Sequence, residues 1–372
     1  MEKNFVIKNG ALKGIALFSP EVSPEDSSGS EGSVSLTIKD NKLTFKISSF
    51  RYVLVGEESI EINDNVDLIL PLKKLQDIVK NFDNEQELKF KIKDSDIEIK
   101  ISGIKYKLKA LEMNDGQIIQ EERGEEYLVK TSKFLEGFKK LKIAMGDDEV
   151  RYYLNGIHTE ILQNKNNEND LFFVATSGHL MGTFGHKQEG FEIKEKAIVP
   201  KKVVSEVIKV LESASEEVKV SIKNNKMSVK TEKLEILVKL IEAEFPDYNR
   251  VIPNENSKTI TFETDIFKTT LSKILIISAT DKSKEVTLLS KDKVLNLEVV
   301  SENGQTADAE IPLTNDFDEL NTKLNSKYIL DILAQIVGDG NTKIRFFDGN
   351  SPLIIEKEND KNLLYVVMPI RV

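Results

Sequence analysis

The sequence contains no cysteine among its 372 residues, which excludes disulfides and thiolate metal sites. Arginine is also scarce, with 6 residues against 46 lysines. Arginine makes fixed bidentate contacts, whereas lysine is a mobile point charge, so a basic surface here suits diffuse attraction rather than base reading. No apolar run reaches the roughly 18 residues of a membrane helix, and the first residues do not form a signal peptide. These absences predict a soluble, cytoplasmic protein.

Positive charge is in deficit overall, because the net charge is −10. Domains that bind nucleic acid usually carry a basic excess, so the total taken alone argues against that function. The length allows two or three domains, and a hydrophobic content of 40% is enough to bury their cores.

One pattern occurs three times, at intervals of 125 to 130 residues, beginning at Leu70, Val199 and Leu324. Each copy predicts a short amphipathic helix, and three segments of alternating hydrophobicity with Asx or Gly turns follow it. The predicted helices are 71–82, 200–212 and 323–336. The predicted strands are 87–93, 96–101 and 104–110, then 217–223, 226–230 and 233–241, then 342–347, 352–357 and 363–370.

A second, less regular helix pattern precedes each copy, within 6–18, 132–143 and 265–276. A unit repeated at domain length predicts three copies of one fold. We therefore expect an α+β protein of three tandem domains, each made of two helix-plus-antiparallel-sheet halves. Their expected boundaries are 1–123, 124–251 and 252–372.

The charge is distributed unevenly between helices and sheets. The six helix segments carry sixteen lysines against six acidic residues, a net +10, so the remainder of a chain with net −10 carries −20. One interpretation is that lysine is simply common at exposed helix positions. The other is that the helices share a surface that attracts the DNA backbone without reading sequence, while the acidic remainder repels DNA. On charge alone, the DNA-facing candidates are Lys73, Lys74, Lys139 and Lys140.

Four segments go beyond the repeat: 149–156, 174–179, 244–253 and 365–372. In this order and at these spacings they closely resemble the bacterial DNA polymerase III beta subunit, the sliding clamp. The resemblance covers the second and third expected domains well, and the first in plan and length. It implies a head-to-tail homodimeric ring without catalytic activity. Helices would line a hole for double-stranded DNA, and sheets would face outward.

The resemblance also implies a pocket between the second and third domains. It would accept short peptides of DNA polymerases and clamp-loader subunits that carry a glutamine and two bulky apolar residues. Leu180 and Met181 stand where the family usually has a basic residue and then leucine, and Ser177 replaces an acidic residue, so we expect a more apolar pocket. The matching positions are Leu154, Thr176, Gly178, His179, Leu180, Met181, Pro246, Arg250, Val251, Asn325, Tyr328, Ser351, Val366, Met368, Pro369, Ile370 and Arg371. Alternatively, 365–370 is only a terminal strand, with Pro369 marking an edge.

Two further surfaces follow from the resemblance. The matching DNA contacts are Tyr152, Tyr153, Lys201 and Lys202, although either tyrosine could equally be a core residue. The ring interface would join Tyr106 and Leu108 of one protomer to Ile276 and Ile277 of the other, through an apolar patch that could also be plain core. The acidic loop 20–31 departs from the family, which has a basic residue there, so a DNA contact in that loop is doubtful.

Catalytic alternatives find little support. The three histidines lack an acidic cluster at ligand spacing, and no phosphate-binding glycine loop occurs, so neither a metal site nor a cofactor is expected. The remaining alternative is a clamp-like scaffold or decoy, which binds partner peptides without being loaded on DNA.

Overall fold

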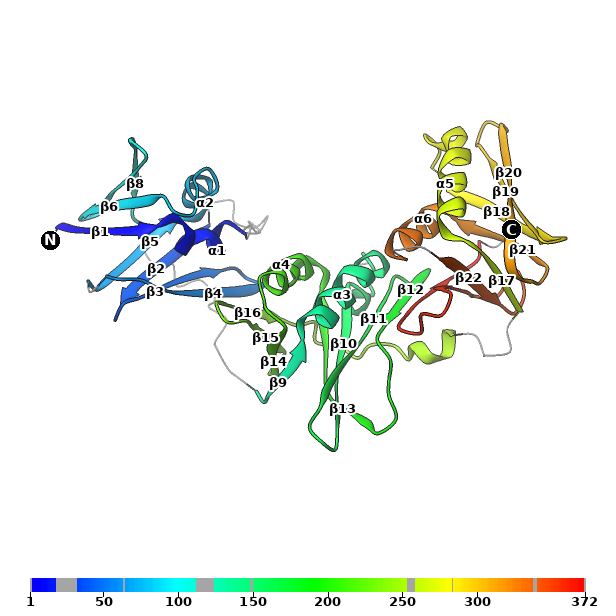
Figure 1. Ribbon diagram of the computed structural model, residues 1–372, viewed down its shortest axis with the longest axis horizontal. Helices are drawn as coiled ribbons and strands as arrows, with labels where there is room; N and C mark the ends of the chain where they lie inside the picture. Colours follow the sequence, from blue (N-terminus) through cyan, green and yellow to red (C-terminus); the bar gives the residue numbers. More distant parts are fainter. Residues whose placement is uncertain are drawn as a thin grey trace. The chain divides into compact units, whose positions relative to one another are not determined.

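The computed structural model describes residues 2–17, 32–62, 64–111, 124–147, 150–252, 258–282, 284–336 and 340–370. Within these ranges the chain is α+β, with antiparallel strands and short helices, as the sequence predicts (Figure 1). By its contacts the chain divides into two compact units. The first unit is Met1–Leu135 with Lys202–Leu240, and the second unit is Glu136–Lys201 with Ile241–Val372. The expected loop 20–31 and Arg371 lie outside the described residues.

The first unit holds two antiparallel sheets. One has the order β1 (Glu2–Lys8), β6 (Glu87–Lys93), β7 (Asp96–Ile101) and β8 (Ile104–Lys109). The other has the order β5 (Val66–Pro71), β2 (Ser33–Lys39), β3 (Lys42–Ser48), β4 (Tyr52–Ser59), β16 (Leu234–Lys239), β15 (Lys226–Lys230), β14 (Glu217–Lys223) and β9 (Glu126–Lys130). Strands of the first and second repeats therefore share one sheet.

The second unit holds a single sheet of twelve strands, in which the second and third repeats are likewise joined. Its order is β13 (Phe191–Pro200), β10 (Gly156–Asn164), β11 (Asn169–Thr176), β12 (Leu180–Phe184), β24 (Leu363–Val367), β23 (Leu353–Lys357), β22 (Asn341–Phe346), β17 (Lys258–Glu263), β20 (Thr306–Phe317), β19 (Val294–Val300), β18 (Glu285–Lys291) and β21 (Leu320–Asn325). The strands expected after each repeated helix are all present, with ends that differ by a few residues.

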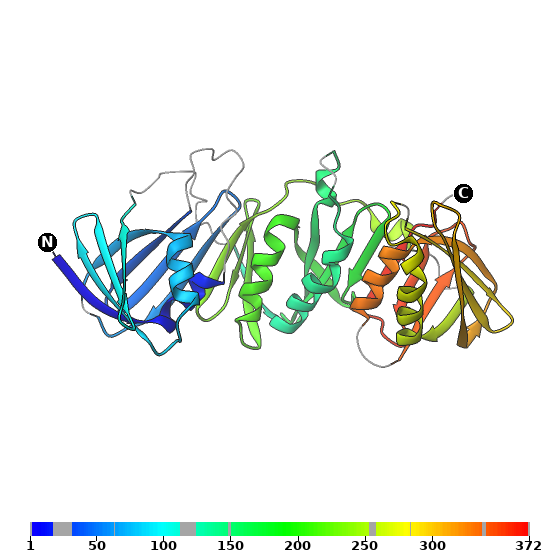
Figure 2. The same cartoon turned by 90° about the horizontal axis from the view of Figure 1, so that it is seen from above.

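The six expected helical segments are also present. They are α1 (Lys13–Ala16), α2 (Leu72–Lys80), α3 (Thr131–Leu141), α4 (Lys201–Glu212), α5 (Thr264–Ile274) and α6 (Ser326–Gln335). In the second unit, α5 and α6 lie side by side (Figure 2). The expected start of α6 was wrong, because the chain stays extended through Asn325, whose side chain caps the helix by accepting from the backbone N–H groups of Lys327 and Tyr328.

The first helix packs closely against the sheet. A 3₁₀ turn (Asn9–Leu12) precedes α1, and together they cover less than the expected 6–18. A Cβ added at Gly14 would lie 2.6 Å from Cζ of Phe45, so the glycine permits close approach of the helix to the sheet. This close approach compensates for the low helix propensity of the segment.

The two junctions between repeats are built in the same way. In the first unit, the N–H of Lys239 donates to the carbonyl of Arg51 at 2.9 Å where β16 meets β4. In the second unit, the N–H of Met368 donates to the carbonyl of His179 at 2.9 Å where β24 meets β12. At each junction a serine hydroxyl accepts from the backbone N–H of the first residue of the strand. The N–Oγ distance is 3.1 Å for Ser49 at β4 and 3.2 Å for Ser177 at β12. The internal repeat therefore extends to individual hydrogen bonds.

Candidate partner-binding site

Every described position of the expected partner pocket lies in the second unit. The β12–β24 junction is its centre, because Met181 pairs with Val366, and the hydrogen bond from Met368 to His179 continues that pairing. The N–H of Ile370 donates to the carbonyl of Lys323 at 2.8 Å, which brings the end of the chain to the strand that leads into Asn325 and α6. Backbone pairing therefore brings together the described pocket positions that lie around the junction.

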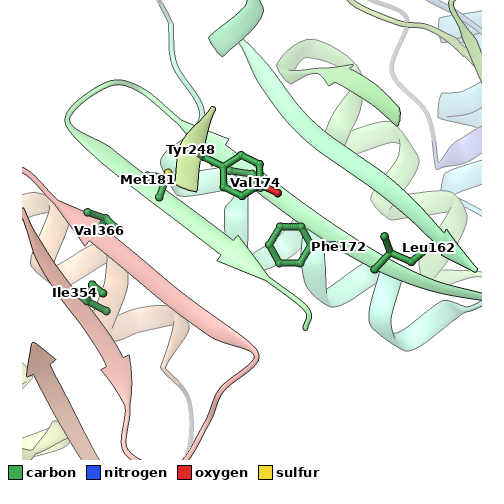
Figure 3. Close-up of a cluster of buried hydrophobic side chains, with 7 residues drawn as sticks. All are labelled: Leu162, Phe172, Val174, Met181, Tyr248, Ile354 and Val366. Carbon is green, nitrogen blue, oxygen red and sulfur yellow. The ribbon is translucent and has the colours of Figure 1, made fainter. Parts of the chain in front are cut away.

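The floor beside this junction is an apolar cluster. It consists of Leu162, Phe172, Val174, Met181, Tyr248, Ile354 and Val366, all buried and drawn in Figure 3. Met181 and Val366 are 4% and 3% exposed, while Met368 at the end of the pairing is 37% exposed. Leu180 is also buried but belongs to the opposite face of β12, because side chains alternate along a strand. Of the three pocket departures from the family pattern, Ser177, Leu180 and Met181, only Met181 joins this cluster.

Residues 241–252 run across this cluster and carry Pro246, Arg250 and Val251. All three side chains are exposed, and Arg250 is the most open, with 83% of its side chain accessible. Its Nε donates to Oδ2 of Asp247 at 2.9 Å, and Oδ1 of Asp247 accepts from the backbone N–H of Asn249 at 3.2 Å. The bond from Asn249, assisted by Arg250, lowers the pKa of Asp247 from its ordinary value. An exposed guanidinium held in a fixed direction suits polar or carboxylate groups of a peptide.

The sequence did not reveal the polar side chains beside the cluster. Nζ of Lys187 lies 2.8 Å from Oε2 of Glu160 and donates to the hydroxyl of Tyr248 at 2.7 Å. Nε2 of His158 lies 3.2 Å from Oε1 of Glu160. The His158 ring stacks on the ring of Phe245, with 4.8 Å between their centroids. The uninterrupted apolar run Leu171–Ala175 in β11 was the available signal, because it indicates a strand covered on both faces.

The remaining pocket candidates lie around the same strands. A Cβ added to Gly178, at φ +89°, would lie 2.9 Å from Nη1 of Arg151, so this turn lies against the segment that leads into Leu154. Thr176 Oγ1 accepts from the N–H of Gly178 at 3.0 Å. Ser351 is in the turn after β22, where its N–H donates to Asp348 at 2.7 Å. The pocket as a whole stays a prediction.

The expected DNA-facing residues have varied environments. Tyr152 is 52% exposed and packs edge-on against Tyr153 at 6.0 Å, so it is not a core residue. Three of the lysines are paired with acids, in Lys73–Asp77 (3.1 Å), Lys140–Glu136 (2.8 Å) and Lys201–Asp147 (3.2 Å). Lys74, Lys139 and Lys202 are exposed. The helices are therefore less positive in effect than the lysine count implies.

The expected ring-interface residues are divided between the two units. Tyr106 and Leu108 are half-buried on β8, and Tyr106 packs edge-on against Phe82 at 6.5 Å. Ile276 is 74% exposed and Ile277 is half-buried, both in a 3₁₀ turn (Leu275–Ser278). Their assignment to an interface stays a prediction.

The described part of the chain has neither a metal-binding cluster nor a membrane-spanning helix. Its His, Asp and Glu side chains form no group of three or more suited to a metal ion. The helices of these ranges are all too short or too polar to span a membrane.

Comparison with known proteins supports the architecture. The chain is 27% identical over 341 residues to the beta sliding clamp of Caulobacter vibrioides, and 25% identical over 343 residues to that of Pseudomonas aeruginosa, with 91% of each chain covered. A solved Caulobacter crescentus beta sliding clamp, with PEG bound to a region proposed to tether the beta motif, has a TM-score of 0.87 at 26% identity over all of both chains. The DNA polymerase III subunit beta of Pseudomonas aeruginosa, at 23% identity and TM-score 0.88, shares the fold.

Three repeated α+β domains, joined edge to edge through their sheets, place the chain in the class of DNA clamps. Residues 128–247 match the DNA polymerase III beta subunit central domain, and residues 249–371 match the C-terminal domain of the same protein. The chain belongs to the DNA polymerase III beta subunit family.

Proposed function

We propose that this chain is a DNA sliding clamp, a processivity factor that encircles duplex DNA and tethers polymerases. The observation that carries the proposal is the repeated junction, since one fold copied three times and joined edge to edge is the construction of the sliding clamps that it resembles. Two protomers would close a ring through Tyr106 and Leu108 on one side and Ile276 and Ile277 on the other. Ile276, at 74% exposure, and half-buried Ile277 lie in one turn, so both side chains are available to the apolar core of such an interface.

Binding to DNA would be independent of sequence. The candidates are lysines, which neutralise phosphates and release counterions, and two tyrosines; none of them carries a fixed fork for base edges. Because Lys73, Lys140 and Lys201 already have acidic partners, we expect weak contacts that allow sliding. Retention would then come from the closed ring rather than from affinity.

Partner peptides would bind at the β12–β24 junction, over Met181, Val366 and Met368. Methionine suits such a site because its flexible thioether adapts to different apolar side chains. Exposed Arg250 and His179 border the floor and offer hydrogen bonds to a glutamine or a carboxylate. The PEG in the related C. crescentus clamp supports a binding region of this kind.

A topology assay tests the clamp. The protein, placed by a clamp loader on nicked circular DNA, should stay bound through gel filtration and should leave after a restriction enzyme linearises the circle. Equal retention on both forms refutes the ring.

Light scattering should give twice the 42.0 kDa of one chain. A scaffold or decoy would bind peptides but would not be loaded and would not increase polymerase product length.

A double substitution tests the pocket. Met368→Ala with Pro369→Ala should weaken peptide binding at least about tenfold, because truncation of a central interface anchor costs about 2 kcal/mol or more. Val300→Ala is the control, since Val300 is 54% exposed on β19 and outside the expected pocket. Unchanged affinity in the double variant contradicts the assignment.

A further inference from the structure

Three pocket candidates depend on how residues 241–252 are anchored. Pro246, Arg250 and Val251 are exposed, so their own side chains bury little surface. The anchors are their neighbours: Tyr248 is 9% exposed within the apolar cluster (Figure 3). Phe245 stacks on His158 with an interplanar angle of 14°. The position of the pocket wall is therefore set by two aromatic side chains that point away from solvent.

One ammonium group links this segment to the sheet. Nζ of Lys187 contacts the carboxylate of Glu160 on β10 and donates to the hydroxyl of Tyr248, at 2.8 and 2.7 Å. It also lies over the ring of Phe172 at 4.9 Å and over the ring of Tyr248 at 5.4 Å. These four contacts of the ammonium group together hold the flexible lysine side chain in one position. Lys187 thus fixes how far the Tyr248 side chain lies from the sheet and where its hydroxyl points.

The charges in this network require each other. Glu160 is 2% exposed, and a buried carboxylate is costly unless it is paired. Although burial raises the pKa of Glu160, hydrogen bonds from His158 and Lys187 bring it below its ordinary value. Burial lowers the pKa of Lys187, but its bonds to Glu160 and Tyr248 raise it overall. Burial raises the pKa of the Tyr248 phenol. The pair is therefore ionised at neutral pH, and the phenol stays protonated.

The other repeat shows that the fold does not need this network. By strand register, Ser35 and Thr37 of β2 take the places of His158 and Glu160, and Thr44 takes the place of Phe172. The β4–β16 junction nevertheless forms with the same backbone bonds. The charged network is thus an addition to the second unit, at the junction where the partner site is proposed.

We propose that Lys187 is a positioning residue of the partner site, which locks Tyr248 to Glu160 and so holds Pro246, Arg250 and Val251 where an incoming peptide meets them. This inference rests on the proposed peptide-binding function. The lysine itself does not touch the peptide. Its removal should therefore change affinity through the mobility of residues 241–252.

The test uses the full-length protein and a fluorescein-labelled synthetic peptide with one glutamine, one leucine and one phenylalanine. Lys187→Met should weaken binding about five- to tenfold in fluorescence anisotropy, while Lys187→Arg restores most of the affinity. Tyr248→Phe, which removes only the hydroxyl, should weaken binding similarly. The double variant should bind no more weakly than Lys187→Met alone, because the bond that Tyr248→Phe removes is already lost in Lys187→Met. Amide exchange within 241–252 should accelerate in both single variants.

The control is Lys194→Met, which removes an exposed lysine paired with Glu192 at 3.6 Å on β13. Wild-type affinity in Lys187→Met and Tyr248→Phe, or equal weakening in the control, overturns the inference. Additive losses in the double variant overturn it as well. If wild-type protein fails to bind the peptide at all, the proposed function fails. If wild type binds and only the Met368/Pro369 variant loses binding, the positioning role alone fails.

Discussion

Tyr365 provides a sharp test of how the second unit holds together. Its side chain is 0% exposed, and its hydroxyl donates to the carbonyl of Lys140 at 2.7 Å. That carbonyl is among the last four of α3, which have no acceptor role inside the helix. The hydroxyl thus ties the end of α3 to β24, the strand that forms the junction.

Tyr365→Phe removes this bond without changing the ring. The free energy of unfolding should fall by about 1–3 kcal/mol. The variant loses the net contribution of the hydrogen bond and leaves a buried carbonyl unpaired. At roughly 2 °C per kcal/mol for a chain of this size, Tm should fall by about 2–6 °C. Because burial raises the pKa of Tyr365, the hydroxyl stays a donor, and the loss should be the same at pH 6 and pH 9.

Calorimetry of wild type and variant measures the effect. Tyr153→Phe is the matched control, since Tyr153 is half-buried and its ring contact with Tyr152 needs no hydroxyl. An unchanged Tm in Tyr365→Phe, or an equal fall in the control, would refute the argument. A loss confined to pH 6 would mean that the phenol ionises and stops donating by pH 9, contrary to its burial.

Three further outcomes are expected. Gly349→Ala should lower Tm more than Gly304→Ala, because its Cβ would lie 1.8 Å from the backbone oxygen of Asn321, whereas alanine at Gly304 has open space and is penalised only by the φ of +78°; an equal effect would contradict this. Since the folded pKa of Glu160 lies below its ordinary 4.5, its contribution to stability is present above pH 4.5 and is lost as pH falls through the lowered pKa. Urea midpoints should therefore drop below pH 4.5, and less steeply in Glu160→Gln. Ile276→Asp should convert the dimer to monomers in sedimentation equilibrium without loss of helical circular dichroism; a persistent dimer would contradict the interface.

The architecture was readable from the sequence because its signals are local. Alternation in 87–101 and the Asx turns that follow each helix fix strands and hairpins without knowledge of their neighbours. The start of α6 was misplaced because the cap formed by Asn325 outweighed the amphipathic pattern that reached back to 323.

The wall of the pocket was not readable in the same way. Glu160, Lys187 and Tyr248 are separated along the chain, and each one alone looks like an ordinary surface or core residue. Only the strand register and the path of 241–252 bring Glu160 and Tyr248 to 2.8 and 2.7 Å from Nζ of Lys187. The pairing of helix lysines with acids was hidden for a related reason, since the charge count includes Asp77 and Glu136 but does not show that they lie beside Lys73 and Lys140.

The two repeat junctions are held by main-chain hydrogen bonds, which place few demands on side-chain identity. The first junction carries Thr44 and Lys46 beside the apolar side chains of Val53, Val55 and Leu237. The second carries aromatic and sulfur-containing side chains on the same kind of backbone frame. Side chains at one junction can therefore change without disturbing the backbone pairing that joins the repeats.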